Sequence, residues 1–326
     1  MALNKKLRIT IQLVLFALLG TGVVWYMFSQ MSAEQRSQMA EAIKQINPIW
    51  VIPFIATTLL AHWARAKRWQ LLLHPLGIYP STANTLFSVL IGYLVNLVPP
   101  RAGEVAKCTV LARYENVPAD KMVGTIVAER AWDVVCLVAI IAGGLIWQAS
   151  VMDDHARENL MHYLPKGKSL LITGLIILAL VGLLFFLYKR QPAGKLSRLI
   201  QGLATGVSSI WKIKKRSLFL LYSFIIWAGF VLQILIGFWA LPGMEHLGVG
   251  AAVMALIFGS VGMIAAPGGI GLYPFLTALI LVSGYGVSEA NANAFGWVSW
   301  TGVTALILIM GITSLLLLPV YNKEKS

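Results

Sequence analysis

Residues 99–107 read Pro99-Pro100-Arg101-Ala102-Gly103-Glu104-Val105-Ala106-Lys107 and close the apolar run 83–98. The two prolines stop a helix, and the glycine frees the backbone that follows them. Three charged residues arrive within seven positions, from Arg101 to Lys107. In a membrane protein, irregular backbone with ionisable groups is tolerated only where protein buries it or where it lines a wet cavity. The stretch therefore predicts a break inside the membrane, at the wall of a functional site.

A second break, Pro267-Gly268-Gly269-Ile270-Gly271, interrupts apolar sequence late in the chain. One interpretation is that its glycines allow close helix packing and nothing more. A proline and three glycines within five residues nevertheless favour a true break in the helix. We interpret the two breaks as opposite walls of one site. The predicted hairpin-break residues are Pro99, Pro100, Gly103, Pro267, Gly268, Gly269, Gly271 and Tyr273.

The composition is that of a membrane protein, because 58% of the 326 residues are hydrophobic and 12% are charged. Several apolar runs approach the roughly 20 residues that a helix needs to cross a bilayer. The first run is too long for a signal-peptide core and has no small-residue cleavage site, so it is expected to be retained. The predicted fold is an all-α polytopic membrane protein with two re-entrant helical hairpins and about six full transmembrane helices. These helices are expected over residues 9–28, 49–72, 124–147, 169–188, 218–240 and 294–318.

Basic residues decide how the chain is predicted to cross the membrane. Cytoplasmic loops carry an excess of Lys and Arg. Residues 189–216 hold eight Lys or Arg and no acid, whereas Asp153 and Asp154 lie in an acidic-leaning loop. The two loops reach their expected sides only if residues 83–98 begin a re-entrant hairpin that turns at Pro99–Gly103. If residues 251–285 form a second hairpin, from the outer face, Lys323 and Lys325 near the C-terminus also lie inside. The resulting plan is an inverted repeat in the inner cell membrane, with both termini cytoplasmic.

We expect one integral membrane domain over residues 1–326, with a basic connection over 189–216 between the halves 1–188 and 217–326. The net charge of +13 is expected to face anionic lipid headgroups rather than nucleic acid. No G-x-x-x-x-G-K-[ST] sequence is present, and the two cysteines have no metal-site spacing. We therefore expect no cofactor, no metal and no enzymatic activity.

A charged group is predicted around the first break. Its candidate substrate-binding residues are Arg65, Arg68, Arg101, Glu104, Lys107, Glu129, Arg130 and Asp133. Five bases and three acids leave a formal charge of +2, so an anion would complete the balance. A phosphate suits this arrangement, because an arginine fork can hold two of its oxygens.

Structural interpretations compete with binding for several of these residues. Arg65 and Arg68, with the neighbouring Lys67, could be orientation signals at a helix end. Arg130 could be neutralised by acids within one helical turn. Three further residues are interpreted as structural: a packing role for His62, and an interfacial aromatic belt for Trp297 and Trp300. Arg101 and Glu104 are the strongest candidates for function, because they follow a break in apolar sequence.

The chain resembles the transmembrane domain of lysylphosphatidylglycerol synthase/flippase proteins. The matching sequence is Asn96-Leu-Val-Pro99-Pro-Arg101-Ala-Gly103-Glu104-Val-Ala-Lys107, Glu129-Arg130-Ala-Trp-Asp133 and Pro267-Gly268-Gly269-Ile-Gly271. The resemblance implies a domain that moves a phospholipid or polyprenyl-linked lipid between leaflets. Lys107 departs from the family's more usual arginine, and Tyr273 and Pro274 replace its basic residue and glutamate. The chain ends at Ser326, just past its last predicted span, so lysyl transfer is not expected.

Three functions stay open from the sequence. The first is a flippase-like transporter that holds the headgroup phosphate of an anionic lipid between the two hairpins, with Arg101, Lys107 and Arg130 as its cations. The second is a secondary transporter of a small organic anion. The third is a non-transporting partner of an envelope-lipid enzyme, and a homo-oligomer is a further open alternative.

Overall fold

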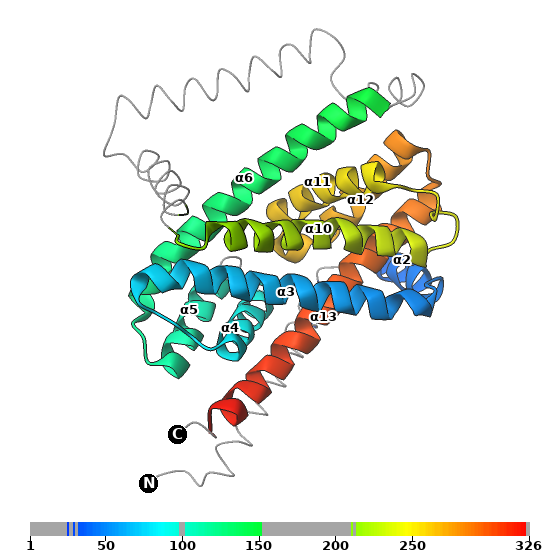
Figure 1. The fold of residues 1–326 in the computed structure, drawn as a ribbon. Coiled ribbons are helices and arrows are strands. Elements are labelled where there is room, and N and C mark those ends of the chain that lie inside the picture. Colours follow the sequence, from blue (N-terminus) through cyan, green and yellow to red (C-terminus); the bar gives the residue numbers. More distant parts are fainter. Residues whose placement is uncertain are drawn as a thin grey trace, which may run out of the picture.

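The computed structural model describes residues 32–97, 102–151 and 213–323, together with Trp25, Ser29 and Ile210. Every regular element in this part of the chain is a helix (Figure 1). The α-helices are α2 (Ala33–Lys44), α3 (Val51–Leu73), α4 (Thr82–Val95), α5 (Ala102–Glu115), α6 (Ala119–Val151), α10 (Arg216–Ala240), α11 (Val249–Ala265), α12 (Leu272–Tyr285) and α13 (Glu289–Lys323). Three 3₁₀ turns connect them: η1 (Pro48–Trp50), η2 (His74–Leu76) and η3 (Pro267–Gly269).

The prediction of a helical membrane protein is confirmed. Within the described residues, three segments are long and apolar enough to cross a membrane: Pro48–Leu76, Arg216–Ala240 and Glu289–Lys323. The predicted span 169–188, and all of the predicted span 9–28 except Trp25, lie outside the described residues. The arrangement of six spans and two re-entrant hairpins therefore stays a prediction.

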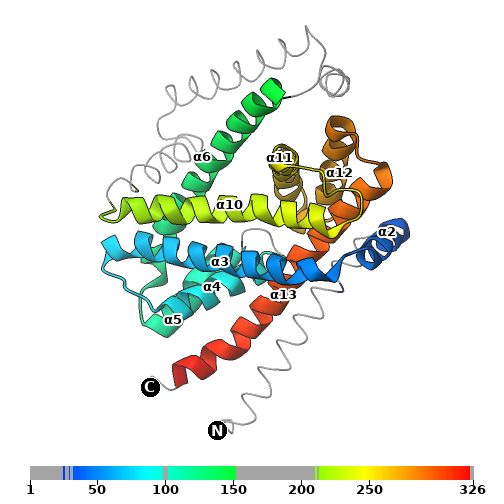
Figure 2. The ribbon, with the colours of Figure 1, turned by 45° about the vertical axis from the view of Figure 1, so that its right-hand side comes forward.

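Two antiparallel helices, α3 and α10, form the centre of the fold and lie side by side in both ribbon views (Figure 2). Near the start of α3, Thr58 accepts a 2.6 Å hydrogen bond from Gln233, which lies toward the end of α10. Near the end of α3, Arg68 donates to Ser223 in the first half of α10, at 3.3 Å. Gly229 allows the helices to approach between these two points, since a Cβ there would lie 3.5 Å from Ala61.

The first hairpin pairs α4 with α5 through a contact between two glycines. A Cβ on Gly92 would lie 2.8 Å from the carbonyl oxygen of Gly103, and a Cβ on Gly103 would clash with the carbonyl oxygen of Gly92. The Gly103 amide also donates to the side chain of Asn96, at 2.8 Å. The prediction that Gly103 lies in irregular backbone is wrong, because α5 already begins at Ala102. Its small size, rather than its conformational freedom, is what the structure uses.

The second hairpin pairs α11 with α12 around a backbone break. Gly268, Gly269 and Gly271 have φ of 62°, 69° and 71°, a region that favours glycine. The predicted break is therefore present, but Tyr273 is not part of it, because α12 begins at Leu272. Tyr273 instead packs on α11, where a Cβ on Gly262 would lie 2.7 Å from its Cα.

The two hairpins open at opposite ends of the α3–α10 pair. α4 follows the end of α3 after residues 74–81, and α11 follows the end of α10 after residues 241–248, so both connections have eight residues. Because α3 and α10 are antiparallel, these connections lie at opposite ends. The hairpins also lie on opposite sides of the pair, with α4 and α5 beside α3 and with α11 and α12 beside α10 (Figures 1 and 2).

Gly103→Ala should destabilise the protein by about 1–3 kcal/mol, because the added methyl group overpacks the α4–α5 contact. Thermal unfolding of the purified protein in detergent measures this loss. Gly124→Ala is the matched control, since Gly124 is an exposed glycine on α6 with nothing within 4 Å of its Cβ position. The control should keep or raise the unfolding temperature. Equal unfolding temperatures for wild type and Gly103→Ala would contradict the close packing.

Candidate functional site

Glu129 on α6 is the centre of a buried charged cluster. Its side chain has no exposed surface, and four cations approach its two oxygens. Lys107 Nζ lies 2.6 Å from Oε2. Around Oε1 are Arg130 at 3.0 Å, Arg65 at 3.5 Å and Arg68 at 3.6 Å. The cluster therefore joins three helices that are separate in the sequence: α3, α5 and α6.

Asp133 lies one turn further along α6 and shares three of these cations. Arg68 Nη2 donates to Oδ1 at 2.7 Å, and Arg65 Nη1 donates to Oδ2 at 3.3 Å. Arg130 Nη2 approaches the same Oδ2 at 3.7 Å. The predicted neutralisation of Arg130 by acids on its own helix is therefore seen, but those acids also bind the two arginines of α3.

Arg65 and Arg68 are interior residues. Their side chains are only 7% and 0% exposed, and Arg68 also donates to Ser223 on α10. Their interpretation as orientation signals at the membrane surface is wrong for both. Lys67 points elsewhere and donates to Thr82 at 2.8 Å. The signal that separates these residues is helical spacing, because Arg65 and Arg68 are three positions apart and share a face that Lys67 does not.

Arg130 is the most exposed cation of the cluster. Its side chain is 41% exposed, against 7% or less for Arg65, Arg68 and Lys107. Its Nε lies 3.5 Å from Glu104, whose own side chain is 28% exposed. Arg130 and Glu104 are therefore the charged groups that an approaching molecule could reach.

A small cavity of about 30 Å³ adjoins the exposed side of the cluster. It is lined by Arg65, Val89, Gly92, Tyr93, Asn96, Gly103, Glu104, Lys107, Glu129 and Arg130. This volume is close to that of one water molecule, so no headgroup fits in the conformation seen. A headgroup that contacts the exposed Arg130 and Glu104 would therefore lie outside this cavity in the conformation seen.

Three polar residues near the cluster were missed by sequence reasoning. Tyr93 lines the cavity and has its ring 5.5 Å from the Arg65 guanidinium carbon. Asn96 lines the cavity and caps Gly103. Ser223 accepts from Arg68 and, at 2.9 Å, from the indole of Trp132. Tyr93 and Asn96 could have been found as polar residues three positions apart in an apolar run.

The hairpin ends lie near one another around a shared apolar cluster. Buried Leu94 and Leu97 at the end of α4 belong to it, and Ile270 and Tyr273 from the second hairpin pack against it. Arg101 and both residues of the Pro99-Pro100 pair lie outside the described residues, so the predicted meeting of the two breaks is seen only for their flanking residues.

Two tryptophans of α13 belong to this apolar cluster. Trp297 and Trp300 are 3% and 5% exposed, so their predicted place in an interfacial belt is wrong. The Trp300 indole donates to the carbonyl oxygen of Gly268 at 2.8 Å. This hydrogen bond ties the irregular backbone of the second break to α13 and gives a part-buried carbonyl oxygen a partner.

His62 packs as predicted, but the expectation that its polar atoms are satisfied is wrong for Nδ1. Its ring meets Tyr93 edge to face at 4.8 Å, and the residue is 9% exposed. Its Nδ1 atom is buried and has no hydrogen-bond partner among the described residues.

These observations define the class of protein: a multi-pass helical membrane protein with a buried ion-pair cluster beside a helical hairpin. The family model for the lysylphosphatidylglycerol synthase TM region matches residues 9–311, and the chain belongs to this family. The family relates the chain to membrane lipids. No curated protein and no solved structure matches the chain.

Glu129→Gln should destabilise the protein strongly, by about 3–5 kcal/mol, because it leaves buried cations without their shared carboxylate. Glu104→Gln is the matched control, since Glu104 is part-exposed and has one 3.5 Å ion pair, to Arg130. Its loss should be about 1 kcal/mol or less. Chemical or thermal unfolding of both variants in the same detergent compares them. Similar losses for the two variants would contradict the central role of Glu129.

Proposed function

We propose that this protein is a flippase-like transporter of a lipid with an anionic headgroup, such as a phospholipid or a polyprenyl-linked lipid. The single observation that carries the proposal is Arg130, a half-exposed cation of a buried cluster that borders a cavity at the end of a helical hairpin. The family's relation to membrane lipids supports a lipid as the ligand.

The charge balance of the cluster favours an anion. Four cations (Arg65, Arg68, Lys107 and Arg130) meet three carboxylates (Glu104, Glu129 and Asp133), a formal surplus of one positive charge among the described residues. Arg101 would add a second positive charge, as the sequence predicts. A phosphate offers several acceptor oxygens to such a site, and the Arg130 guanidinium can hold two of them.

The hairpin lengths support re-entrance into the membrane. α4 and α5 have 14 residues each, about 21 Å of helix, whereas the hydrocarbon core is about 30 Å thick. α12 has the same length as these two, and α11 has 17 residues. Because the hairpins open at opposite ends of the α3–α10 pair, an inverted repeat would place their closed ends near the midplane. Substrate sites in inverted-repeat transporters lie at that depth.

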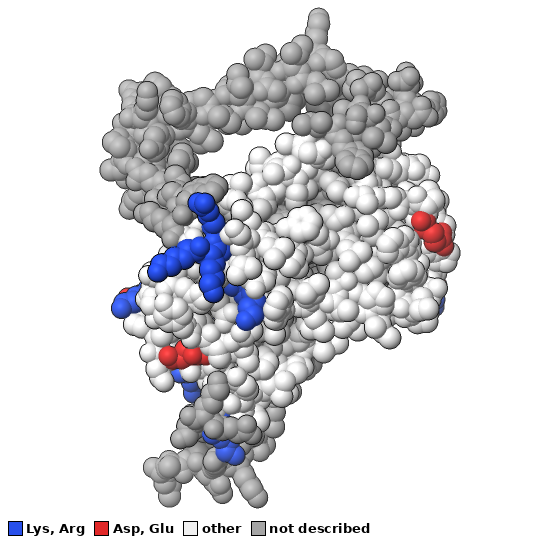
Figure 3. Space-filling view, viewed as in Figure 1, with Lys and Arg blue, Asp and Glu red and all other residues white. Residues whose placement is uncertain are grey.

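The distribution of charge supports a cytoplasmic opening for the first hairpin. Lys and Arg gather at one end of the face shown in Figure 3. At the end where α3 finishes and α10 begins, the described basic residues are Lys67, Arg113, Lys121, Lys214, Lys215, Arg216 and Lys323. The connections at the opposite end, 241–248 and 286–288, contain no Lys or Arg; the first contains Glu245 and the second precedes Glu289. By the positive-inside rule, the basic end faces the cytoplasm.

Cysteine labelling tests this orientation. In intact cells, a membrane-impermeant maleimide should label Glu245→Cys but not Lys214→Cys, and it should label Lys214→Cys after permeabilisation. Both positions are exposed, and the two native cysteines are buried or half-buried, so wild-type protein gives the background. Labelling of both variants from the same side would contradict hairpins that open on opposite faces.

Arg130→Gln should abolish most headgroup translocation and leave the fold intact, because the neutral amide keeps much of the side chain but cannot pair with phosphate. Losing a hydrogen bond to a charged group costs about 1.5–3 kcal/mol, or about tenfold to a hundredfold in rate. The assay measures transfer of a fluorescent anionic lipid between leaflets of reconstituted vesicles.

Lys121→Gln is the matched control for this assay. It removes an exposed cation from the start of the same helix, outside the cavity, and should leave the rate unchanged. A folded Arg130→Gln protein that transfers lipid at the wild-type rate would remove Arg130 from the mechanism. Competition by a water-soluble anion without any lipid transfer would favour a small-anion transporter instead.

A further inference from the structure

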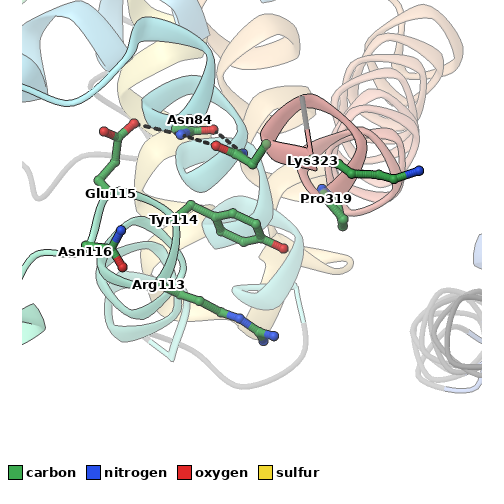
Figure 4. A pocket seen from close by; sticks show the side chains of 8 residues that line it. Asn84, Arg113, Tyr114, Glu115, Asn116, Pro319 and Lys323 are labelled. Atoms are coloured by element: carbon green, nitrogen blue, oxygen red, sulfur yellow. Dashed lines mark hydrogen bonds between the residues drawn. The ribbon is translucent and has the colours of Figure 1, made fainter. Parts of the chain in front are cut away.

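A second, larger hollow lies far from the charged cluster, at the open base of the first hairpin. It is an open cleft of about 390 Å³, within the about 300–1,000 Å³ range of small-molecule sites. Its walls are the last turns of α5 and α13, and Asn84 in the first turn of α4 lies at its floor (Figure 4). Glu104, in the charged cluster, and Arg113, in the cleft, are nine residues apart on α5, about 13 Å along the helix.

The floor of the cleft is fixed by a closed set of hydrogen bonds. The side-chain amides of Asn84 and Asn322 donate hydrogen bonds to each other's oxygen atoms, at 2.9 and 2.7 Å, and tie α4 to the end of α13. Glu115 Oε1 accepts from the Asn84 amide at 2.7 Å and from both the backbone and hydroxyl of Ser81 at 2.9 Å. Among the described residues that line the cleft, Glu115 carries the one carboxylate, and protein donors engage it, so it opposes an incoming anion less than a free carboxylate would.

The walls of the cleft present positive charge and an amphipathic ring. Arg113 and Lys323 are exposed and line the cleft from α5 and from α13. In Figure 4 the Lys323 side chain is directed away from α5, and its ammonium lies on a flexible four-carbon stem. Tyr114 lies beside Arg113, whose guanidinium carbon is 5.9 Å from its ring centroid, and Figure 4 shows both side chains projecting from α5 toward α13. Pro319 adds an apolar surface on the α13 side. Arg or Lys next to Tyr at the end of a membrane span is typical of the headgroup region.

We propose that this cleft binds the phosphate of an anionic lipid headgroup at the membrane surface, held between Arg113 and Lys323, with Tyr114 against the glycerol region. The site differs from the buried cluster in that it has the volume for a headgroup without any movement of the hairpin. Its existence does not depend on transport. Where transport occurs, the cleft would hold a lipid beside the open base of the first hairpin.

The test is lipid titration of the purified full-length chain, followed by thermal unfolding in a neutral detergent. The probes are short-chain phosphatidylglycerol, short-chain phosphatidylcholine and inorganic phosphate. Phosphatidylglycerol should stabilise the wild type saturably, and the other two should not. Arg113→Gln together with Lys323→Gln should weaken its apparent affinity by about fivefold for each cation removed.

Two comparisons keep the result specific. Lys121→Gln removes an exposed cation that does not line the cleft, and it should keep the wild-type affinity. The double variant is also made in the Arg130→Gln background, which removes the cation of the other site, and there it should show the same relative loss, so a failure here is distinct from a failure of the proposed transport. Unchanged affinity in the double variant, or an equal loss in Lys121→Gln, would overturn the proposal. Equal stabilisation by inorganic phosphate would overturn the lipid and leave a soluble-anion site.

Arg113 and Lys323 lie in the last turns of α5 and α13. A purely structural role for these two cations therefore predicts a different result. Cations in the last turn stabilise a helix through its dipole. In that case the double variant would unfold at a lower temperature without lipid, and the increment added by phosphatidylglycerol would equal that of the wild type. This outcome would also contradict the proposed site. The test therefore compares the rise in unfolding temperature that phosphatidylglycerol causes, not the unfolding temperature itself.

Discussion

Glu129 is fully buried and lies within 3.6 Å of a nitrogen atom from each of four cations. Burying a charge is costly unless other charges and hydrogen bonds compensate it. The four cations come from α3, α5 and α6, so these helices can pack only in an arrangement that brings their charges to this carboxylate. Asp133 reinforces the same arrangement through Arg65 and Arg68. The cluster thus fixes the position of the first hairpin relative to α3 and α6.

Small residues make the remaining close contacts. In a membrane, helices gain little from the hydrophobic effect on one another, so close backbone approach and interhelical hydrogen bonds supply the specificity. Gly92 with Gly103, and Gly262 with Tyr273, set the two hairpins, and the Trp300 bond to Gly268 holds the second break. The first hairpin carries charge at its closed end and the second carries aromatic and aliphatic groups. This asymmetry is consistent with a lipid headgroup meeting one hairpin and apolar surface meeting the other.

Much of the fold follows from the sequence, because a helix that crosses a membrane needs a run of about 20 apolar residues. Long apolar runs predicted α3, α10 and α13 to within about five residues at each end, and Pro267 with its glycines predicted the second break. The errors have a common cause. Helical spacing showed that Arg65 and Arg68 share a face, but only packing shows that this face meets Glu129 and Asp133 rather than the membrane surface. Trp297 and Trp300 were placed at the interface for the same reason, because burial depends on neighbours from other segments.

The sequence by itself determined that the chain is a helical membrane protein, where its apolar helices lie, and which charged residues belong together. These properties depend on local composition and on spacing along one helix. The tertiary structure alone decided that Arg130 is the accessible cation of the cluster, that the cavity beside it is smaller than a headgroup, and that Asn84, Arg113 and Lys323 line a larger cleft. Exposure and volume arise only when separate helices meet, so no pattern within a single segment encodes them.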